Sequence, residues 1–154
     1  MTKQPLAPGL GAPLKRAVAL LDAIPYWLIA LICRAATCTV FWSSGTQKLS
    51  DWSATLALFE NEYHVPLIPP HPAAYMATTI EISCAVLVMI GLATRAAVFV
   101  LLGMTAVIEI FIYPEAWPTH IQWLAFMFVI LARGPGKVSL DALIGPRLFG
   151  AKAA

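Results

Sequence analysis

Three ionisable residues lie inside long apolar stretches of the sequence: Arg34, Glu81 and Glu109. A charged side chain within a bilayer costs several kcal/mol unless it finds a partner, so such residues mark either structural ion pairs or polar sites. The chemistry of this chain is therefore expected at these positions and at the polar residues that come close to them.

Arg34 and Glu81 are predicted to lie at nearly the same depth in neighbouring helices. Counted from the same end of the predicted helices and at 1.5 Å per residue, their depths differ by only about 2 Å. Two interpretations stay open, a structural ion pair and a polar pocket for a proton-carrying ligand such as a quinone head group. A helical stripe with spacings of four, three, four and three would place a lysine at the mouth of that pocket: Arg34, Cys38, Phe41, Gly45 and Lys48.

Glu109 and His120 are predicted to meet near the outer water interface. Glu109 lies about 20 Å along its helix, and His120 begins the next apolar segment at a comparable level. A Glu–His pair at such an interface can relay protons, and the alternative is a hydrogen bond with no further role. No metal site is predicted, because neither the histidines nor the cysteines show ligand spacing.

Four apolar segments are predicted to position these residues as transmembrane helices, at about 24–43, 73–92, 96–112 and 118–132. Each approaches the roughly 20 residues that cross a bilayer, the fourth only if its polar first turn is counted. Residues 45–51 are expected to end the first helix. The segment 52–72 contains four prolines, which should stop any helix there, and is expected to be an outer loop that folds back onto the membrane surface.

Short surface helices are predicted at both ends of the chain. Residues 14–22 carry apolar side chains on one side and charged ones on the other, which is typical of a helix that lies on a membrane. Near the other end, the start of a short helix is predicted at Ser139-Leu140-Asp141. We therefore interpret residues 1–23 as a tail with a surface helix, and 24–154 as a single all-α domain, a four-helix membrane bundle.

Composition and charge support a membrane protein and predict its orientation. Sixty per cent of the residues are apolar and 12% are charged, too few charges to cover a small water-soluble protein. Eight of the ten Lys and Arg residues fall on one side of the predicted helices, so both termini are expected in the cytoplasm. The net charge of +2 and the lack of a basic stripe give no reason to expect nucleic acid as a partner.

In order and spacing, several of these residues resemble the DoxX family of small four-helix membrane proteins. The matching elements cover about 34–143: Arg34, Ser44-Gly45-Thr46-Gln47-Lys48-Leu49, Glu81, Gly91-Leu92-Ala93-Thr94-Arg95 and the Gly134-Pro135-Gly136 and Ser139-Leu140-Asp141 pieces. The resemblance implies a multi-pass protein of the bacterial inner membrane. It marks Arg34, Lys48, Glu81 and Arg95 as family positions, without a proven catalytic role for any of them.

The family takes its name from a membrane subunit of a thiosulfate:quinone oxidoreductase, and other members associate with oxidative-stress or metal-stress proteins. By resemblance, this chain is expected to serve a quinone-linked redox or stress-response system with a protein partner. The candidate ligand-binding residues are Arg34, Lys48, Glu81, Glu109 and His120. The sequence has no cofactor motif of its own, so any cofactor is a bound one, with a quinone as the candidate.

Two other functions stay open. The first is a non-catalytic membrane anchor or accessory protein for a redox or metal-handling partner, docked on the predicted outer loop 52–72. The second is a small transporter or channel subunit, in which a pore would require a homo-oligomer because four short helices form a narrow bundle. A homo-oligomer is also compatible with the quinone-linked function and with the anchor function.

Overall fold

The computed structural model describes residues 11–63 and 65–149, which form helices and turns with no β-strand among them. This confirms the all-α class. The helices are α1 (Gly11–Asp22), α2 (Tyr26–Ser50), α3 (Trp52–Asn61), α4 (Pro70–Ile90), α5 (Thr94–Val107), α6 (Trp117–Arg133) and α7 (Leu140–Phe149). A π-helical turn, η1 (Ile108–Ile112), and a 3₁₀ turn, η2 (Pro114–Ala116), join α5 to α6. Both short terminal helices that the sequence predicts are present as α1 and α7.

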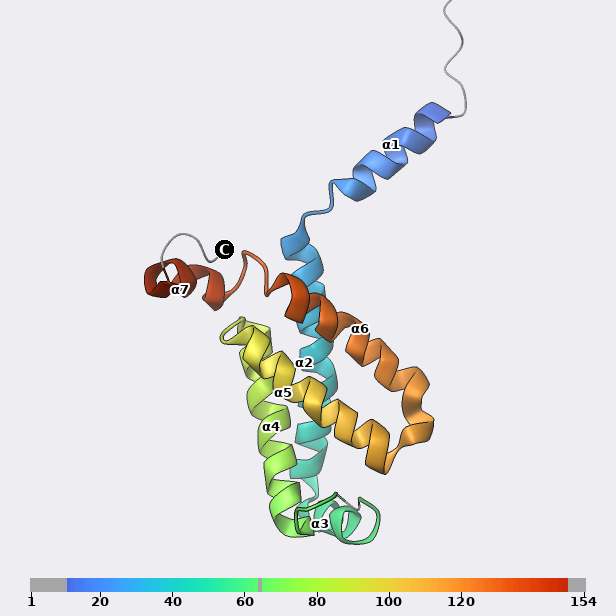
Figure 1. Cartoon of the computed structure of the whole chain (residues 1–154), viewed down its shortest axis with the longest axis vertical. Coiled ribbons are helices and arrows are strands. Elements are labelled where there is room, and N and C mark those ends of the chain that lie inside the picture. The colour runs from blue at the N-terminus through green and yellow to red at the C-terminus, as the bar shows by residue number, and fades with distance from the viewer. Residues whose placement is uncertain (1–10, 64, 150–154) are drawn as a thin grey trace, which may run out of the picture.

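The body of the molecule consists of α2, α4, α5 and α6 (Figure 1). α2 packs against α4 and α6, and α5 packs against the same two helices. The largest fully buried side chains between them are Phe41, Leu101, Met127, Ile130 and Val88. Small residues such as Ala85 and Ala97 belong to the same core and allow the helix backbones to approach closely.

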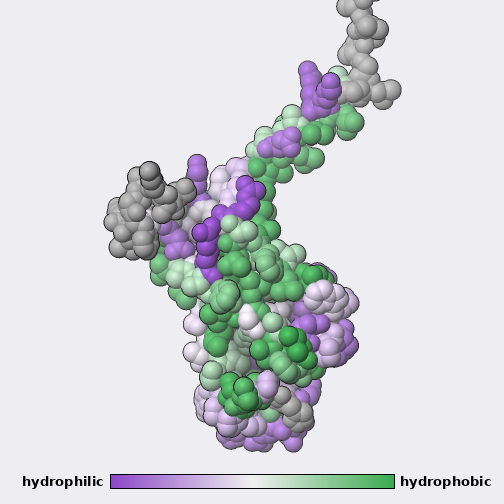
Figure 2. Space-filling model, viewed as in Figure 1, coloured by the Kyte–Doolittle hydropathy of each residue, from purple (hydrophilic) through white to green (hydrophobic). Residues whose placement is uncertain are grey.

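Among the described residues, three helical stretches are long and apolar enough to cross a membrane: Tyr26–Ser50, Pro70–Ile90 and Thr94–Ile112. α6 has 17 residues, which at 1.5 Å per residue gives about 25 Å. Apolar side chains on these helices face outward, and Figure 2 shows that they cover much of the middle of the body. The chain is therefore a membrane protein whose helices present surfaces suited to lipid.

The first two membrane helices differ from the predicted spans at one end. α2 continues past residue 43 to Ser50, so it ends only at the far side of the predicted break 45–51, with Asp51 as its C-cap. Gly45 does not break α2 because it lies where α2 meets α4, and a Cβ atom there would come within 2.6 Å of Ile82 Cγ1. α4 begins at Pro70 and not at residue 73, since prolines in the first turn of a helix remove no intrahelical hydrogen bond.

The prediction that 52–72 contains no helix was wrong, because α3 occupies its first half. The Asp51 carboxylate caps α3 by accepting a hydrogen bond from the amide of Ala54 at 2.9 Å. Phe59 is buried against the first turns of α4, which holds α3 across the end of the body. The prolines all follow α3, so they limit only the second half of the segment.

The body has two ends with different partners. At the α3 end, α3 covers the last turn of α2 and the first turns of α4. At the other end, which we call the turn end, residues 91–93 join α4 to α5, and α7 begins beside them. The amide of Asp141 donates to the carbonyl of Gly91 at 2.8 Å. α1 extends away from the turn end, with the side chains of residues 12–22 all exposed (Figure 1).

Candidate functional site

A cavity of about 400 Å³ lies between α2, α4, α5 and α6 at the α3 end of the body. Its walls are mainly apolar and include Val40, Phe41, Phe59, Met76, Ile80, Val100, Met104, Val107 and Trp123. The polar side chains that reach it belong to Ser44, Lys48, Tyr63, Glu81, Tyr113 and His120. An apolar pocket with a few convergent polar groups, in the range of roughly 300–1,000 Å³, is the usual form of a small-molecule site.

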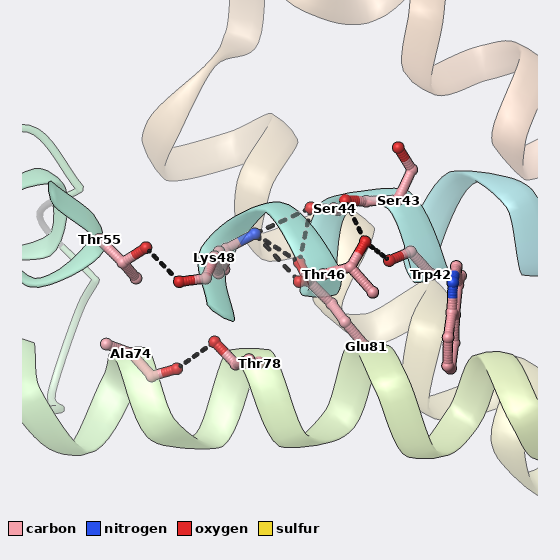
Figure 3. Close-up of polar contacts among 9 residues, drawn as sticks. All are labelled: Trp42, Ser43, Ser44, Thr46, Lys48, Thr55, Ala74, Thr78 and Glu81. Atoms are coloured by element: carbon pink, nitrogen blue, oxygen red, sulfur yellow. Dashed lines mark hydrogen bonds and ion pairs between the residues drawn. The ribbon is translucent and has the colours of Figure 1, made fainter. Parts of the chain in front are cut away.

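Lys48 on α2 and Glu81 on α4 form an ion pair in the cavity wall (Figure 3). Lys48 Nζ lies 2.9 Å from Glu81 Oε1 and 3.0 Å from Oε2. It also donates to the Ser44 hydroxyl at 2.8 Å, and that hydroxyl donates to Glu81 Oε1 at 3.1 Å. The Glu81 side chain is 3% exposed and that of Lys48 is 17% exposed. Two opposite charges are thus held together, almost out of water, beside an apolar space.

The local sequence explains how this pair is positioned. Ser44 and Lys48 are four residues apart and lie on one face of α2. Gly45 brings α2 against α4 at the level of the pair, since a Cβ atom there would lie 3.3 Å from Glu81 Cβ. The hydroxyl of Thr55 in α3 donates to the carbonyl of Lys48 at 3.0 Å, which fixes the last turn of α2 (Figure 3).

Lys48 also borders a second cavity, of about 320 Å³, in the angle between α2 and α3. The lining of this second cavity is more polar and includes Gln47, Ser50, Asp51 and Thr55. It is polar and large enough to hold water. Lys48 therefore belongs to the walls of both an apolar and a polar cavity.

His120 on α6 and Glu109 in η1 form a second pair, as the sequence predicts. His120 Nδ1 lies 2.5 Å from Glu109 Oε2. The His120 side chain is 4% exposed and lines the cavity, whereas Glu109 is 20% exposed and does not line it. With Nδ1 bonded to Glu109, Nε2 is the ring nitrogen that is left for a ligand. The pair thus connects the cavity with the surface of the body.

Glu109 projects from a π-helical turn that no residue type in the sequence marks. The amide of Tyr113 donates to the carbonyl of Ile108 at 2.8 Å and closes this turn. π-helical turns are rare and occur frequently at functional sites, because the wider turn changes the direction of the side chains that it carries.

Tyr113 lines the cavity, although its sequence position indicates only an aromatic residue at the membrane interface. Its hydroxyl donates to Glu62 Oε1, and its ring packs edge-on against Tyr63 with 5.6 Å between the ring centroids. Burial and the hydrogen bond to Glu62 raise the pKa of Tyr113 above its usual value. The phenol therefore stays protonated and can act as a hydrogen-bond donor.

Arg34 lies away from this cavity and does not pair with Glu81, so the predicted pair was wrong. Its guanidinium lies at the turn end and donates to four carbonyls. The donor–acceptor distances are 2.8 Å to Val88, 2.5 Å to Val138 and 3.3 Å to Pro135, and the fourth acceptor is Met89. The prediction that Arg34 and Glu81 lie at the same depth was wrong because it assumed that α2 and α4 end at the same level. In fact, α2 extends beyond the end of α4. Arg34 consequently lies beside Val88, about two helical turns from Glu81.

Asp141 completes the contact at the turn end. Its carboxylate accepts from the amide of Ala93 at 2.7 Å, from the amide of Thr94 at 2.9 Å and from the Thr94 hydroxyl at 2.8 Å. It thereby caps the first turn of α5. Gly91 is required here, because its φ is 74° and a Cβ atom would lie 2.9 Å from an Arg34 nitrogen. The segments 91–95 and 134–141 therefore meet in one structural contact. We call this contact, with Arg34 included, the latch.

The remaining histidines do not extend the site. His71 pairs with Glu60 at 2.6 Å on the exposed surface of the α3 end. His64 lies outside the described residues. Within 11–63 and 65–149, no group of three His, Cys, Asp or Glu side chains is arranged to hold a metal ion.

Comparison with known proteins gives one family. The model of the DoxX family matches residues 29–114, which is more than half of the chain. The matched region contains Arg34, Lys48, Glu81 and Glu109, and it ends before His120. No curated protein and no solved structure matches the chain.

Proposed function

The chain belongs to the DoxX family, and on this premise we propose that it is a membrane subunit of a quinone-linked redox or stress-response system. The quinone head group would bind in the cavity at the α3 end. The observation that carries this proposal is that two pairs of proton-carrying side chains, Lys48–Glu81 and His120–Glu109, reach one apolar cavity among lipid-facing helices, the second pair through His120 alone. A quinone takes up protons at its two carbonyl oxygens when it is reduced, so two such pairs suit its chemistry.

The two pairs have different roles in this proposal. The Lys48 ammonium donates a hydrogen bond to one carbonyl oxygen of the ligand, and Glu81 balances its charge. His120 contacts the other side of the ligand through Nε2, and the more exposed Glu109 exchanges protons with water. The protein partner in the redox or stress-response system supplies or accepts the electrons.

We further propose that α6 completes a four-helix bundle in the bacterial cytoplasmic membrane, with both termini in the cytoplasm. In support, α6 packs against both α2 and α5. Basic side chains gather at the turn end, where Arg95 donates to the carbonyl of Ala132 and Arg133 lies 4.6 Å from the ring centroid of Tyr26. By the positive-inside rule this end faces the cytoplasm, which places the cavity in the outer half of the membrane. α1 then lies on the inner membrane surface.

A second candidate function is a non-catalytic anchor for a redox or metal-handling partner that docks on residues 52–72. One observation favours it: Leu67 is fully exposed and has a φ of 68°. A leucine in the left-handed region costs about 1 kcal/mol, and burial in a partner would offset that cost. In this case Leu67→Asp releases the partner, whereas substitutions in the cavity only lower stability.

Quinone content tests the first proposal against the second. The protein is purified in a mild detergent, and the extracted quinone is quantified per chain for the wild type, Glu81→Gln and Glu60→Gln. Glu60 is a matched control because it makes an exposed pair with His71. We expect near-stoichiometric quinone in the wild type and the control. In Glu81→Gln the affinity should fall about tenfold or more, because Lys48 loses the carboxylate that holds its ammonium beside the ligand, and hydrogen bonds to charged groups contribute about 1.5–3 kcal/mol.

Each other result has a definite meaning. Quinone that is absent from the wild type contradicts the quinone proposal and directs attention to a partner at 52–72. Equal amounts of quinone in all three proteins would show that the Lys48–Glu81 pair does not take part in quinone binding.

A further inference from the structure

The cavity at the α3 end is open on one side of the body. Three of its lining residues are also exposed on the molecular surface: Met76 on α4 at 49%, Val100 on α5 at 43%, and Gly103 on α5. All three belong to helical stretches that are long and apolar enough to cross a membrane. The opening between α4 and α5 therefore lies on a surface that faces lipid.

The opening follows from the way α4 and α5 diverge. Near the turn end the two helices are in contact, and Val88 of α4 and Val98 of α5 are fully buried. From there the helices separate toward the α3 end, as Figure 1 shows. Gly103 lines the cavity at this opening, and a Cβ atom at its position would meet no other atom within 4 Å.

The opening and the interior of the cavity differ in chemistry. The rim consists of Met76, Ile80, Val100, Gly103 and Met104, all without a polar side chain. The hydrogen-bonding side chains of the cavity belong to other positions, Lys48 and His120 among them. A ligand with one polar and one apolar part is therefore oriented, with its polar part inside and its apolar part at the opening.

The cavity volume sets a further condition. About 400 Å³ is near the lower end of small-molecule sites. It suits a head group and leaves no room for a long hydrocarbon tail as well. A tail must therefore leave the protein, and the rim between α4 and α5 is where apolar side chains would cover it.

We propose that the cavity takes a long-tailed amphiphile from the bilayer, with its head group inside and its tail passing between α4 and α5 into the lipid. This inference rests on the proposed function and deepens it, because it assigns a lipid-borne quinone and not a water-soluble one. The ligand then enters and leaves through the membrane, and no passage through water is needed. A phospholipid shares the same chemistry, a polar head on an apolar tail.

A bulky residue at position 103 tests this opening. Gly103→Phe adds a ring at the rim, where the new Cβ atom meets no other atom within 4 Å. Gly145→Phe in α7 is the matched control, because its Cβ also meets nothing within 4 Å and it does not line the cavity. Gly103→Leu is a smaller plug. Thermal unfolding of each purified variant establishes that it is folded.

Binding is measured with two quinones that share one ring, one with a polyprenyl tail and one without a tail. In Gly103→Phe we expect affinity for the tailed quinone to fall at least tenfold. Affinity for the tailless quinone should fall less than threefold, because the polar contacts are unchanged. Gly103→Leu should give an intermediate loss of the tailed quinone, and Gly145→Phe should bind both as the wild type does.

The outcomes separate this inference from the proposed function. If the wild type binds neither quinone, the proposed function fails. If it binds both and Gly103→Phe loses both equally, or neither, the opening between α4 and α5 is not the tail exit and the inference fails. If mass spectrometry finds a phospholipid that only Gly103→Phe loses, and no quinone binds, the tail exit is supported and the quinone is overturned as its ligand.

Discussion

The two ends of the body use polar and charged side chains in opposite ways. In the latch, Arg34 donates to four backbone carbonyls and Asp141 accepts from two backbone amides. At the α3 end, Lys48 and His120 bond to carboxylate side chains beside a cavity. Backbone partners are fixed by the fold, whereas side-chain partners can rotate. A charge that is bonded to the backbone therefore holds helices together, and one that is bonded to a side chain can exchange its partner for a ligand.

This difference decides whether a charged residue in an apolar segment indicates a structural contact or a binding site. The last carbonyls of a helix have no intrahelical partner, and in a low-dielectric surrounding they need one. Arg34 supplies it for Met89 at the end of α4 and for two carbonyls that follow α6, and it is a second donor to Val88, whose carbonyl also accepts from the amide of Gly91 at 3.2 Å. Its charge is therefore explained by the fold alone. The same is not true of Lys48, whose three N–H groups all point to side chains.

The arrangement around Lys48 also indicates how a ligand would bind at small cost. A carbonyl oxygen that binds Lys48 must replace one of its three acceptors. Ser44 is the least costly one to replace, because its hydroxyl can keep its own hydrogen bond to Glu81. The ion pair then stays intact, and no charge is left without a partner.

The largest effect is expected when the latch loses its arginine. Arg34→Met removes a charged donor from four carbonyls, and we expect the free energy of unfolding to fall by about 3–5 kcal/mol. Denaturation of the protein in mixed micelles, followed by tryptophan fluorescence, measures this change. Arg95→Met is the control, since Arg95 is exposed and makes one contact of 3.3 Å with the carbonyl of Ala132. It should change stability by less than about 1 kcal/mol.

A different result for Arg34 would break the comparison between the two ends. If Arg34→Met kept wild-type stability and lost its bound quinone, Arg34 would belong to the functional site and the latch would not be structural.

The next effect concerns the pair at the α3 end. Lys48→Met and Glu81→Gln each leave a nearly buried polar group without its partner, and each should lower the free energy of unfolding by about 2–4 kcal/mol. The double substitution should cost about 1–3 kcal/mol less than the sum of the two single losses, because the interaction between the two residues is lost only once. Quinone binding should not recover. A double variant that is more stable than the two single losses predict, but that binds no quinone, would show that the pair serves the ligand. Losses of stability that simply add would mean that Lys48 and Glu81 do not interact.

Much of the fold follows from the sequence, because the four helices of the body are apolar runs separated by breaks. The errors lie at the α3 end, where Gly45 and the prolines were interpreted as breaks. Gly45 instead serves a close contact between α2 and α4, and Pro70 occupies a first turn. Glycine and proline can each end a helix, but glycine can also serve a close helix contact and proline can also occupy a first turn. Only the packing of the neighbouring helix decides between these roles.

The candidate site was predictable only where the chain itself brings residues together. Glu109 and His120 flank a short connection between two helices, so their meeting follows from the sequence. The partner of Arg34 does not, because it depends on how far α2 extends beyond α4. The π-helical turn at 108–112 and the cap by Asp141 also depend on packing, since no local pattern specifies them. That these residues bind a ligand stays a prediction.

The smallest effect is expected at the edge of the α3 end, where Asp51 caps α3. Hydrogen bonds from the Ala54 amide at 2.9 Å and the Ser53 hydroxyl at 2.8 Å lower the pKa of Asp51 below its usual value. Because the pKa is lower in the folded state, the cap stabilises α3 fully above about pH 4–5. Its contribution is lost as the pH falls through the lowered pKa.

Hydrogen exchange can measure this loss at the first turn of α3. After correction for intrinsic exchange rates, protection of the amides of Ala54 and Thr55 should fall as the pH drops below about 4–5 and through the lowered pKa of Asp51. Asp51→Asn keeps a capping oxygen that does not titrate in this range, so its protection should not depend on pH. If the dependence persisted in Asp51→Asn, another carboxylate would control α3. If neither protein showed it, the cap would not be formed, and the polar cavity beside Lys48 would lose one of its walls.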